Sequence, residues 1–402
     1  MRMFITASGT GQNWRDVVQH LLKDIMAQIE QSDVRPNLAY LYITDKLARD
    51  AQSIVEILRS VSGVQHWVGV TGAAVFSEHA VHYDKPAASC ALLKVDDNAF
   101  AHLTLSEGNY QVDLEKFIDA YRESEAYIGH FYFHPELGYR PDFIVGDLYE
   151  QTLGFMTGGV SSARGTHCVF SENSYDCLVS GYGFSEDVPI VSALFEGFEN
   201  IGREHQITDC RKNVIYALDG RMATSVLSDD MAEWLESALS NDSADAKPTL
   251  AEHSLDDLMA YLPAQGVEMQ LAFRYYQNDM AKRKIKHITA QNESEGTIAS
   301  TYRAAEGGHV SFVFRNPAAL KKDLARSLMD LRVRLNAEGQ LDALKGGIYI
   351  SNFSRFDKDA ADIELVLIRE ILGDIPIAGF YAAGEVSHNS LYNFTGVLTL
   401  FL

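Results

Sequence analysis

The sequence predicts a mixed α/β protein whose mixed β-sheets are covered by helices, and three observations lead to this expectation. Apolar stretches rich in β-branched and aromatic residues alternate with stretches of helical periodicity. A pattern of strand, helix and strand recurs along the chain. At 402 residues and 47% hydrophobic content, the chain is also long enough to bury more than one core.

The recurring pattern is clearest in residues 38–76 and 346–386. Each segment reads as a strand, an amphipathic helix and a second strand that opens into Gly and Ala. Apolar residues in both helices fall at i, i+3 or i+4 spacing, which gives each helix one core-facing stripe. A shorter third copy is expected at residues 142–162, where a helical run precedes an apolar strand that ends in paired glycines. The repeats predict related units that face one another.

A boundary between two domains is expected near residue 240. Small, acidic and proline residues replace the apolar periodicity at Ser240–Leu250, which is typical of a linker. Amphipathic helical stretches precede and follow it, the second opening with Ser254 as an N-cap. The expected domains are therefore residues 1–240 and 241–402.

Two local patterns indicate further elements. Residues 88–95 and 99–105 flank the turn-like Asp96–Asn98, which predicts a β-hairpin. Residues 308–314 read as a strand that leads into a helix beginning at Pro317.

The charge of the chain excludes some functions. The formal net charge is −21 and is spread along the sequence, so the surface would repel phosphate backbones and anionic lipid. No apolar stretch reaches the roughly 20 residues that span a bilayer. The start of the sequence does not resemble a secretory signal. We therefore expect a cytoplasmic protein that binds no nucleic acid and does not insert into a membrane.

Glycine-ended strands are the first candidate for a binding site. Missing side chains would let a ligand approach backbone N–H groups, and ligands of α/β proteins tend to bind beyond the carboxyl ends of strands. Tight turns or close packing explain any single glycine as well. The candidate ligand-binding residues at these ends are Thr71, Gly72, Gly158, Gly159, Ser161, Gly384 and Glu385.

Arg355 is the second candidate, at the end of the strand that opens the C-terminal repeat. Its planar, permanently charged guanidinium suits a carboxylate, and Ser351 or Asn352 could add hydrogen bonds. Glu385 lies opposite in the repeat. Arg355 and Glu385 could together hold a zwitterion such as an amino acid, or they could simply pair with each other.

Histidines supply weak candidates for a metal or haem site. His130 and His134 flank a short aromatic stretch, and His79 and His82 are three residues apart, spacings that a metal or haem iron could use. No third ligand lies at a characteristic spacing, so surface or turn histidines are the plainer interpretation. Haem held by one axial histidine would leave no signature in the sequence.

Signatures of catalysis are incomplete, and we expect no enzymatic activity. The stretch GGVSSAR is similar to a nucleophile elbow but lacks its closing glycine. A hydrolase that uses Ser161 or Cys168 is the remaining catalytic alternative. The four cysteines, which show no CxxC spacing and are expected to be reduced and mostly buried, are Cys90, Cys168, Cys177 and Cys210.

An ordered set of segments resembles one known family. LAYLYIT to HWVGVTGA, the central FMTGGVSS, and the tail IPIAGFYAAGEVS with LYNFTGVLTLF resemble, in order, the N-terminal and C-terminal FIST domains. The resemblance implies a ligand-binding sensory module of signal transduction, proposed for small molecules such as amino acids. In this comparison Gly384 and Glu385 form the family's Gly-Glu turn, and Arg355 is its strand-end arginine.

The resemblance also implies partners. No output domain is visible in the sequence, so we expect a small-ligand sensor that acts in trans on a signalling protein. One alternative is a haem-binding nitric oxide sensor that regulates a histidine kinase or a cyclic-di-GMP enzyme. Another is an interaction scaffold without a ligand. A homo-oligomer is compatible with each of these.

Overall fold

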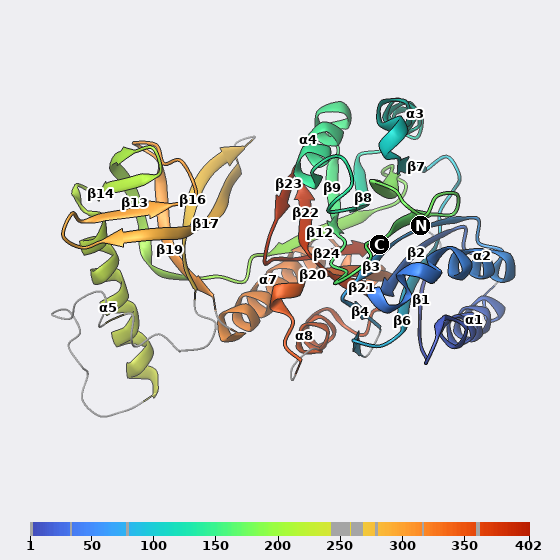
Figure 1. Ribbon diagram of the computed structural model, residues 1–402. Helices are drawn as coiled ribbons and strands as arrows, with labels where there is room; N and C mark the ends of the chain where they lie inside the picture. Colours follow the sequence, from blue (N-terminus) through green and yellow to red (C-terminus); the bar gives the residue numbers. More distant parts are fainter. Residues whose placement is uncertain are drawn as a thin grey trace. The chain divides into compact units, whose positions relative to one another are not determined.

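The computed structural model describes residues 3–32, 34–77, 80–242, 258, 268–277, 280–315, 317–358 and 362–402. The chain forms two compact units, one made of Met1–Glu196 with Leu324–Leu402 and the other of Gly197–Asp323 (Figure 1). These units do not follow the division into residues 1–240 and 241–402, because the C-terminal residues return to the first unit.

Three mixed sheets build the first unit. The first has the order β1 (Met3–Thr10), β6 (Ala87–Lys94), β2 (Leu38–Thr44), β3 (His66–Gly72) and β10 (Val169–Ser171). The second has the order β7 (Phe100–Leu105), β11 (Val179–Phe184), β8 (Ile128–Phe133), β9 (Phe155–Val160), β22 (Gly384–His388) and β23 (Ser390–Tyr392). The third has the order β12 (Ile190–Phe195), β24 (Gly396–Phe401), β20 (Gly346–Asn352), β21 (Ile377–Ala382), β4 (Ala74–Phe76) and β5 (Val81–Tyr83).

Each sheet is organised around one parallel pair of strands, namely β2 with β3, β8 with β9, and β20 with β21. A helix joins the two strands of each pair: α2 (Ala51–Ser62), α4 (Pro141–Thr152) or α8 (Ile363–Leu372). Another helix precedes each pair: α1 (Trp14–Glu30), α3 (Tyr110–Glu123) or α7 (Pro317–Ala337). Short 3₁₀ segments are η1 (Asp45–Asp50), η2 (Glu107–Asn109), η3 (Leu341–Ala343) and η4 (Phe353–Arg355). The predicted repeat of strand, helix and strand is confirmed in three copies. The short copy expected at residues 142–162 also has a first strand, β8, that the sequence pattern did not contain.

We number the repeats in chain order, so that the first contains β2 and β3, the second β8 and β9, and the third β20 and β21. The three repeats exchange strands in a cycle. After its parallel pair, the first repeat sends β4 into the third sheet, where it pairs with β21. The third repeat sends β22 into the second sheet beside β9, and the second sends β10 into the first sheet beside β3. The repeats therefore interlock with approximate threefold symmetry. The second unit is an insertion within the third repeat, between β12 and the strand β20.

Local signals account for where the helices begin and end. Asn13 caps α1 by accepting hydrogen bonds from the backbone N–H groups of Arg15 and Asp16. Helix α2 ends at Gly63, whose φ of 77° favours glycine. Helix α4 begins with Pro141 at its first position. The helix α7 begins at Pro317, as the sequence predicts.

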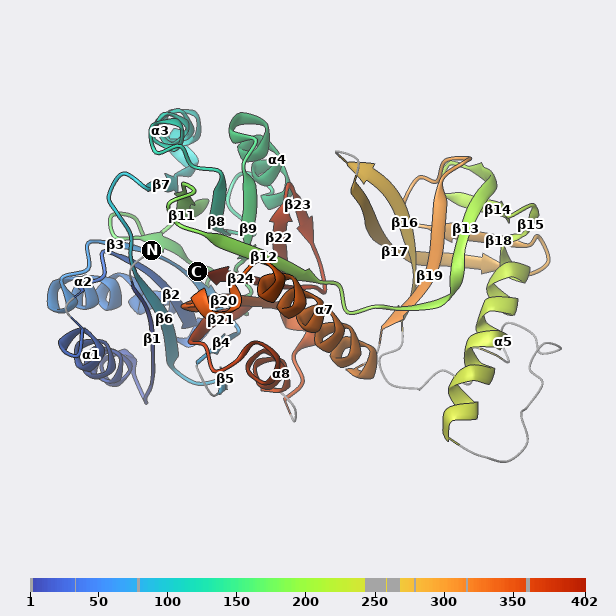
Figure 2. The ribbon, with the colours of Figure 1, turned by 180° about the vertical axis from the view of Figure 1, so that it is seen from behind.

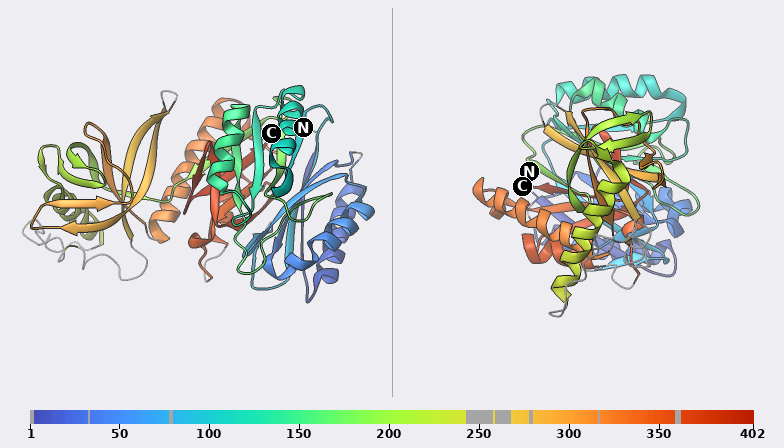
Figure 3. Two further views of the ribbon diagram at one scale, coloured as in Figure 1. Left: turned by 45° about the horizontal axis from the view of Figure 1, so that its top comes forward. Right: turned by 90° about the vertical axis from the view of Figure 1, so that its left-hand side faces the viewer.

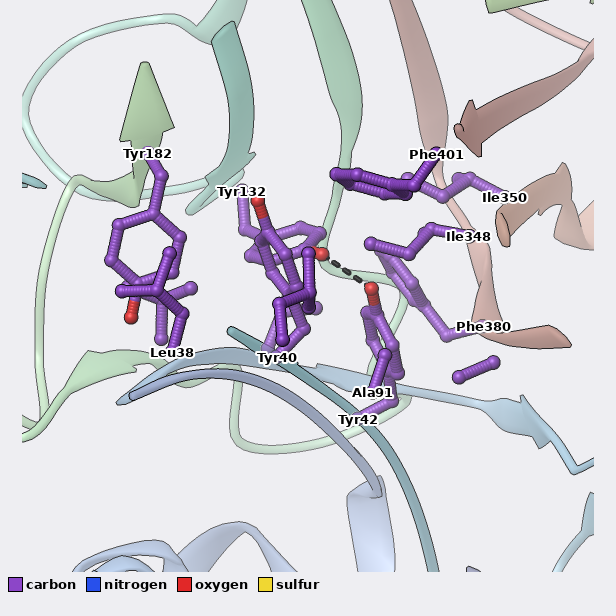
Figure 4. Close-up of a cluster of buried hydrophobic side chains, with 14 of the residues drawn as sticks. Leu38, Tyr40, Tyr42, Ala91, Tyr132, Tyr182, Ile348, Ile350, Phe380 and Phe401 are labelled. Atoms are coloured by element: carbon purple, nitrogen blue, oxygen red, sulfur yellow. Dashed lines mark hydrogen bonds between the residues drawn. The ribbon is translucent and has the colours of Figure 1, made fainter. Parts of the chain in front are cut away.

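The inner faces of the three sheets share one hydrophobic core. Its members come from all three repeats, including Tyr42 of β2, Tyr132 of β8 and Phe380 of β21 (Figure 4). On the outer faces, α1 and α2 pack on the first sheet, α3 and α4 on the second, and α7 and α8 on the third, each with its own cluster of buried residues (Figure 3). Each sheet is therefore buried on both faces, which explains why its central strands read as continuous apolar runs.

The second unit is a closed antiparallel barrel, and helix α5 (Ala223–Asp242) packs against it (Figure 2). Its strands, in order of pairing, are β13 (Glu199–Arg211), β19 (His309–Arg315), β16 (Glu268–Gln277), β17 (Met280–Asn292), β18 (Thr297–Ser300), β14 (Val214–Leu218) and β15 (Arg221–Met222). Pairing of β13 with both β19 and β14 closes the ring. Helix α5 contributes Leu227 and Met231 to the buried cluster of this unit.

One local prediction is wrong, and others lie partly outside the described residues. The segments around Asp96–Asn98 do not form a hairpin, because β6 pairs with β1 and β2 while β7 pairs with β11 in another sheet. Residues 243–250 of the expected linker, and most of the helix expected after it, lie outside the described residues. Among the helices that are described, none is long and apolar enough to cross a membrane.

Candidate functional site

The crossover segments that leave the three parallel pairs meet one another. The hydroxyl oxygens of Thr71 and Ser161 lie 2.9 Å apart, and Ser161 donates to the carbonyl oxygen of Thr71 at 2.8 Å. The backbone N–H of Ala73 donates to Ser162 Oγ at 3.0 Å, and Ser162 Oγ donates to the carbonyl oxygen of Tyr381. The segments that follow the parallel pairs of all three repeats are therefore in contact with one another.

A glycine at the same position in all three repeats allows the two parallel strands to pair closely. Gly69, Gly158 and Gly379 occupy the same register position, each opposite a residue of the preceding parallel strand. Gly158 and Gly379 have φ values of 136° and 155°, which L side chains rarely adopt. A Cβ atom at these two positions would overlap the carbonyl oxygens of Phe131 and Tyr349. Close strand pairing therefore explains these glycines without a ligand.

Gly72 and Gly159 make room for neighbouring repeats. A Cβ atom on Gly72 would lie 2.9 Å from the ring of Phe380, and one on Gly159 would lie 3.1 Å from the Cβ of Ala382. At both positions the missing side chain is replaced by protein atoms of the third repeat.

Glu385 is fully buried within a hydrogen-bonded network (relative exposure 0%). Its Oε1 accepts from Asn352 Nδ2 at 2.9 Å. Its Oε2 accepts from the backbone N–H and the hydroxyl of Thr395, at 3.0 and 2.9 Å. Burial raises the pKa of Glu385 to about 8, although these hydrogen bonds and the charge of Arg355 act in the opposite direction. The preceding Gly384 packs close to Leu391.

Arg355 has a different partner from the one that the sequence suggested. Its Nε and Nη2 both donate to Oε1 of Glu364, at 2.9 and 2.6 Å, and its Nη1 donates to the carbonyl oxygen of Phe195 at 3.3 Å. The side chain of Arg355 is only 1% exposed. Arg355 and Glu385 thus lie in one buried polar region, but each is hydrogen-bonded to other residues.

Three buried polar atoms beside Arg355 make no hydrogen bond among the described residues. They are Tyr349 Oη, Ser351 Oγ and Glu364 Oε2. Tyr349 interacts electrostatically with Glu364 and Arg355, so these polar groups lie near one another. Buried polar atoms are nearly always paired with protein or with ordered water, so incomplete pairing here is unusual. Sequence analysis found Ser351 but missed Glu364, whose only signal was an acid in the first turn of a helix with a mostly apolar face. We refer to Tyr349, Ser351, Arg355 and Glu364 as the Arg355 cluster.

The third repeat differs from the other two at one buried position. Each repeat sends one strand into a neighbouring sheet, and we call this the incoming strand. One residue of each incoming strand pairs with the shared glycine of that sheet. The residue that precedes this paired residue is Val75 in β4, Val169 in β10 and Glu385 in β22. A buried carboxylate thus replaces valine in one repeat of three. Burying a carboxylate is costly, and the hydrogen bonds from Asn352 and Thr395 offset part of that cost.

The predicted histidines are engaged within the fold where the structure describes them. His130 Nδ1 lies 2.7 Å from Thr157 Oγ1, and its Nε2 lies 3.0 Å from the hydroxyl of Tyr132. Burial lowers the pKa of His130 to about 3, so the ring is neutral. The Tyr132 hydroxyl in turn bonds to that of Tyr42 (Figure 4). Ligation of haem iron by His130 would require loss of one of its two hydrogen bonds.

His134 and His82 lie elsewhere in the first unit. His134 Nδ1 accepts from the backbone N–H groups of Glu136 and Leu137, at 3.1 and 3.2 Å. His82 lies in β5, where burial lowers its pKa to about 4. His79 lies outside the described residues.

Ser161 and Cys168 both occupy buried positions. Ser161 Oγ lies 3.0 Å from Nδ1 of His167, whose Nε2 lies 3.9 Å from Glu136 Oε1. Ser161 has a relative exposure of 0%. Burial raises the pKa of the Cys168 thiol to about 12, which leaves it protonated near neutral pH.

Comparison with known proteins identifies the family. The FIST N domain matches residues 37–221 and the FIST C domain matches residues 248–388. An uncharacterized protein of Mycobacterium bovis is 33% identical over 124 residues, which cover 29% of this chain and 31% of that protein. An uncharacterized protein of Mycobacterium tuberculosis is 32% identical over 128 residues, with the same coverage. The chain thus spans about a third of the length of these relatives. With both domains matched over most of its length, the chain belongs to the FIST family, whose domains are associated with signal transduction and ligand sensing.

Proposed function

We propose that this protein is a sensor of a small polar ligand that acts in trans on a signalling protein, by binding and not by catalysis. The observation that carries the proposal is the Arg355 cluster, in which Tyr349 Oη, Ser351 Oγ and Glu364 Oε2 are buried near one another but form no hydrogen bond of ordinary geometry among the described residues. A ligand that forms hydrogen bonds with these atoms removes the cost of burying them unpaired, and this contributes to the free energy of binding.

The chemistry of the unpartnered atoms favours a ligand with hydrogen-bond donors. A carboxylate oxygen and two hydroxyl groups can all accept from an ammonium group. The guanidinium of Arg355 already donates to Glu364 and to the carbonyl oxygen of Phe195, so it has less to offer a ligand carboxylate. We therefore favour recognition of an amine, as in an amino acid, with Glu364 in the role that the sequence suggested for Glu385.

A route to signalling follows from the position of Glu364. This residue lies in the first turn of α8, whereas Ser351 lies in β20. A ligand bound to both would favour one position of α8 on its sheet over others, and a partner such as a histidine kinase or a cyclic-di-GMP enzyme would respond to that change in population.

Thermal unfolding with a panel of amines and amino acids tests this proposal. We expect one or more of these compounds to raise the melting temperature of the wild-type protein, and Tyr349→Phe to abolish that increase. The matched control is Tyr40→Phe, because the Tyr40 hydroxyl is also buried without a partner but lies in the central core. In the absence of ligand, either variant should be neutral or more stable by about 1 kcal/mol, since a desolvated hydroxyl is removed.

Two results would contradict the proposal. One is a panel in which no amine changes the melting temperature. The other is a ligand response that survives Tyr349→Phe, which would leave an ordered water molecule as the occupant of the cluster.

Hydrolysis is a second candidate, and one specific observation favours it. Ser161 Oγ lies within hydrogen-bonding distance of His167, as a nucleophile lies beside its general base. Against it, Ser161 is fully buried and donates its proton to the carbonyl oxygen of Thr71. Turnover of an ester substrate that is lost in Ser161→Ala, with unchanged melting temperature, would favour catalysis over the sensor.

A further inference from the structure

Two histidines and a glutamate from distant parts of the sequence gather where the first and second sheets come together. His66 begins β3, and Glu172 directly follows β10, both in the first sheet. His102 lies in β7, at an edge of the second sheet. One ligand atom from each residue lies within 4.8 Å of the other two.

Two of the three distances between the candidate ligand atoms are longer than ordinary hydrogen bonds and are compatible with metal ligation. His66 Nδ1 lies 3.5 Å and His102 Nδ1 lies 3.4 Å from the same oxygen, Glu172 Oε1. Hydrogen bonds between nitrogen and oxygen are shorter, at about 2.7–3.2 Å. Two ligands in a tetrahedral zinc site, each about 2.1 Å from the ion, are separated by roughly 3.4 Å.

Neighbouring groups aim the ligand atoms inward. Glu172 Oε2 accepts from the backbone N–H of Trp67 at 3.1 Å, which leaves Oε1 to face the histidines. His102 Nε2 lies 3.3 Å from Thr104 Oγ1, and donation to that hydroxyl leaves the lone pair on Nδ1. The buried Nδ1 of His66 makes no hydrogen bond among the described residues. Partners of this kind orient metal-binding residues and fix the ring tautomer.

We propose that His66, His102 and Glu172 bind a divalent transition-metal ion, with Zn²⁺ as the best match. Two imidazoles and one carboxylate suit zinc, whereas Mg²⁺ and Ca²⁺ prefer oxygen ligands alone. The side chains of His66 and His102 are 39% and 21% exposed, so solvent can supply a fourth ligand. The ion would connect the edge of the second sheet to the first sheet and stabilise the folded protein by mass action.

Metal binding can be measured on the full chain without knowledge of any other ligand. Chelator-treated protein should take up one equivalent of Zn²⁺, and its melting temperature should rise with the zinc concentration. Co²⁺ in the same site should give the visible absorption of a tetrahedral complex. His102→Asn and Glu172→Gln should weaken zinc binding at least tenfold, while the matched control His82→Asn, on an edge strand of the third sheet, should leave binding unchanged.

The Glu172→Gln variant distinguishes a specific loss of zinc binding from a loss caused by unfolding. The amide oxygen can still accept from the Trp67 N–H, so this variant should keep the wild-type melting temperature in the presence of chelator. The proposal is overturned if the chelator-treated wild-type protein takes up no stoichiometric zinc, or if both substitutions leave zinc affinity and stabilisation unchanged. In either case Glu172 would hold the two histidines only as long ion pairs. The Arg355 cluster lies outside this site, so these outcomes do not bear on the sensor proposal.

Discussion

The crossover of the third repeat differs from those of the first two in what it buries. The first and second repeats place Val75 and Val169 in the incoming strand, where they pack into the shared core. The third places Glu385 there and surrounds it with donors from Asn352 and Thr395. An apolar residue occupies this position in two repeats, and a buried carboxylate occupies it in the third. The difference teaches that the symmetric positions maintain the fold, and that the departure from symmetry is where function is best sought.

The largest expected effect tests what the repeats have in common. Gly379→Ala should destabilise the protein by roughly 3 kcal/mol or more, because a Cβ atom overlaps a backbone carbonyl and φ lies in a region that alanine avoids. Urea unfolding measures this, and Gly165→Ala is the control because its Cβ meets no atom within 4 Å. Equal stability of the two variants would show that the shared glycine is not required by strand pairing.

The next effect tests the difference itself. Glu385→Val restores the residue of the other repeats but leaves Asn352 Nδ2 and both Thr395 donors unpaired, so we expect a loss of about 2–3 kcal/mol. Glu385→Gln retains an acceptor for Thr395 and should lose less. A Glu385→Val variant as stable as the wild type would mean that the network around Glu385 contributes nothing to the fold.

The third effect is a pH dependence specific to the third repeat. The pKa of Glu385 is raised to about 8 in the folded protein, so the folded state binds this proton more tightly than the unfolded state does. Its contribution to stability is complete below about pH 4.5 and is lost as the pH rises towards 8, by at most about 1.4 kcal/mol per pH unit.

Glu385→Gln removes this titration and serves as the reference. The difference in unfolding free energy between wild type and variant, measured from pH 4.5 to 8, should change in that direction. A difference that is constant over this range would show that Glu385 stays ionised, held by Asn352, Thr395 and the charge of Arg355.

The sequence predicted the local units of this fold but not how they pair. Periodicity defined the strand, helix and strand repeat because each helix must bury one stripe on its own sheet. The exchange of strands was not predictable, since β4 has only three residues and its partner β21 lies some 300 residues away in the sequence. The hairpin at Asp96–Asn98 failed for the same reason. Its turn residues are suitable, but the partners of both strands come from elsewhere.

The candidate sites show the same limit. Motif reasoning brought Asn352, Arg355 and Glu385 into one region because all three lie at ends of neighbouring elements. It did not find Glu364 as the partner of Arg355, because one acid in an amphipathic helix is an ordinary feature. His66, His102 and Glu172 gave no signal at all, since their proximity depends on contact between two sheets and not on spacing along the chain.

The cyclic exchange of strands has a consequence for how the protein is made. On a ribosome, β4 and β9 emerge long before their partners β21 and β22, so the nascent first unit presents unpaired strand edges until translation is almost finished. Such a topology folds slowly and late, and exposed edges invite association between chains. We therefore expect the first two repeats to need shielding from association until the third repeat is released.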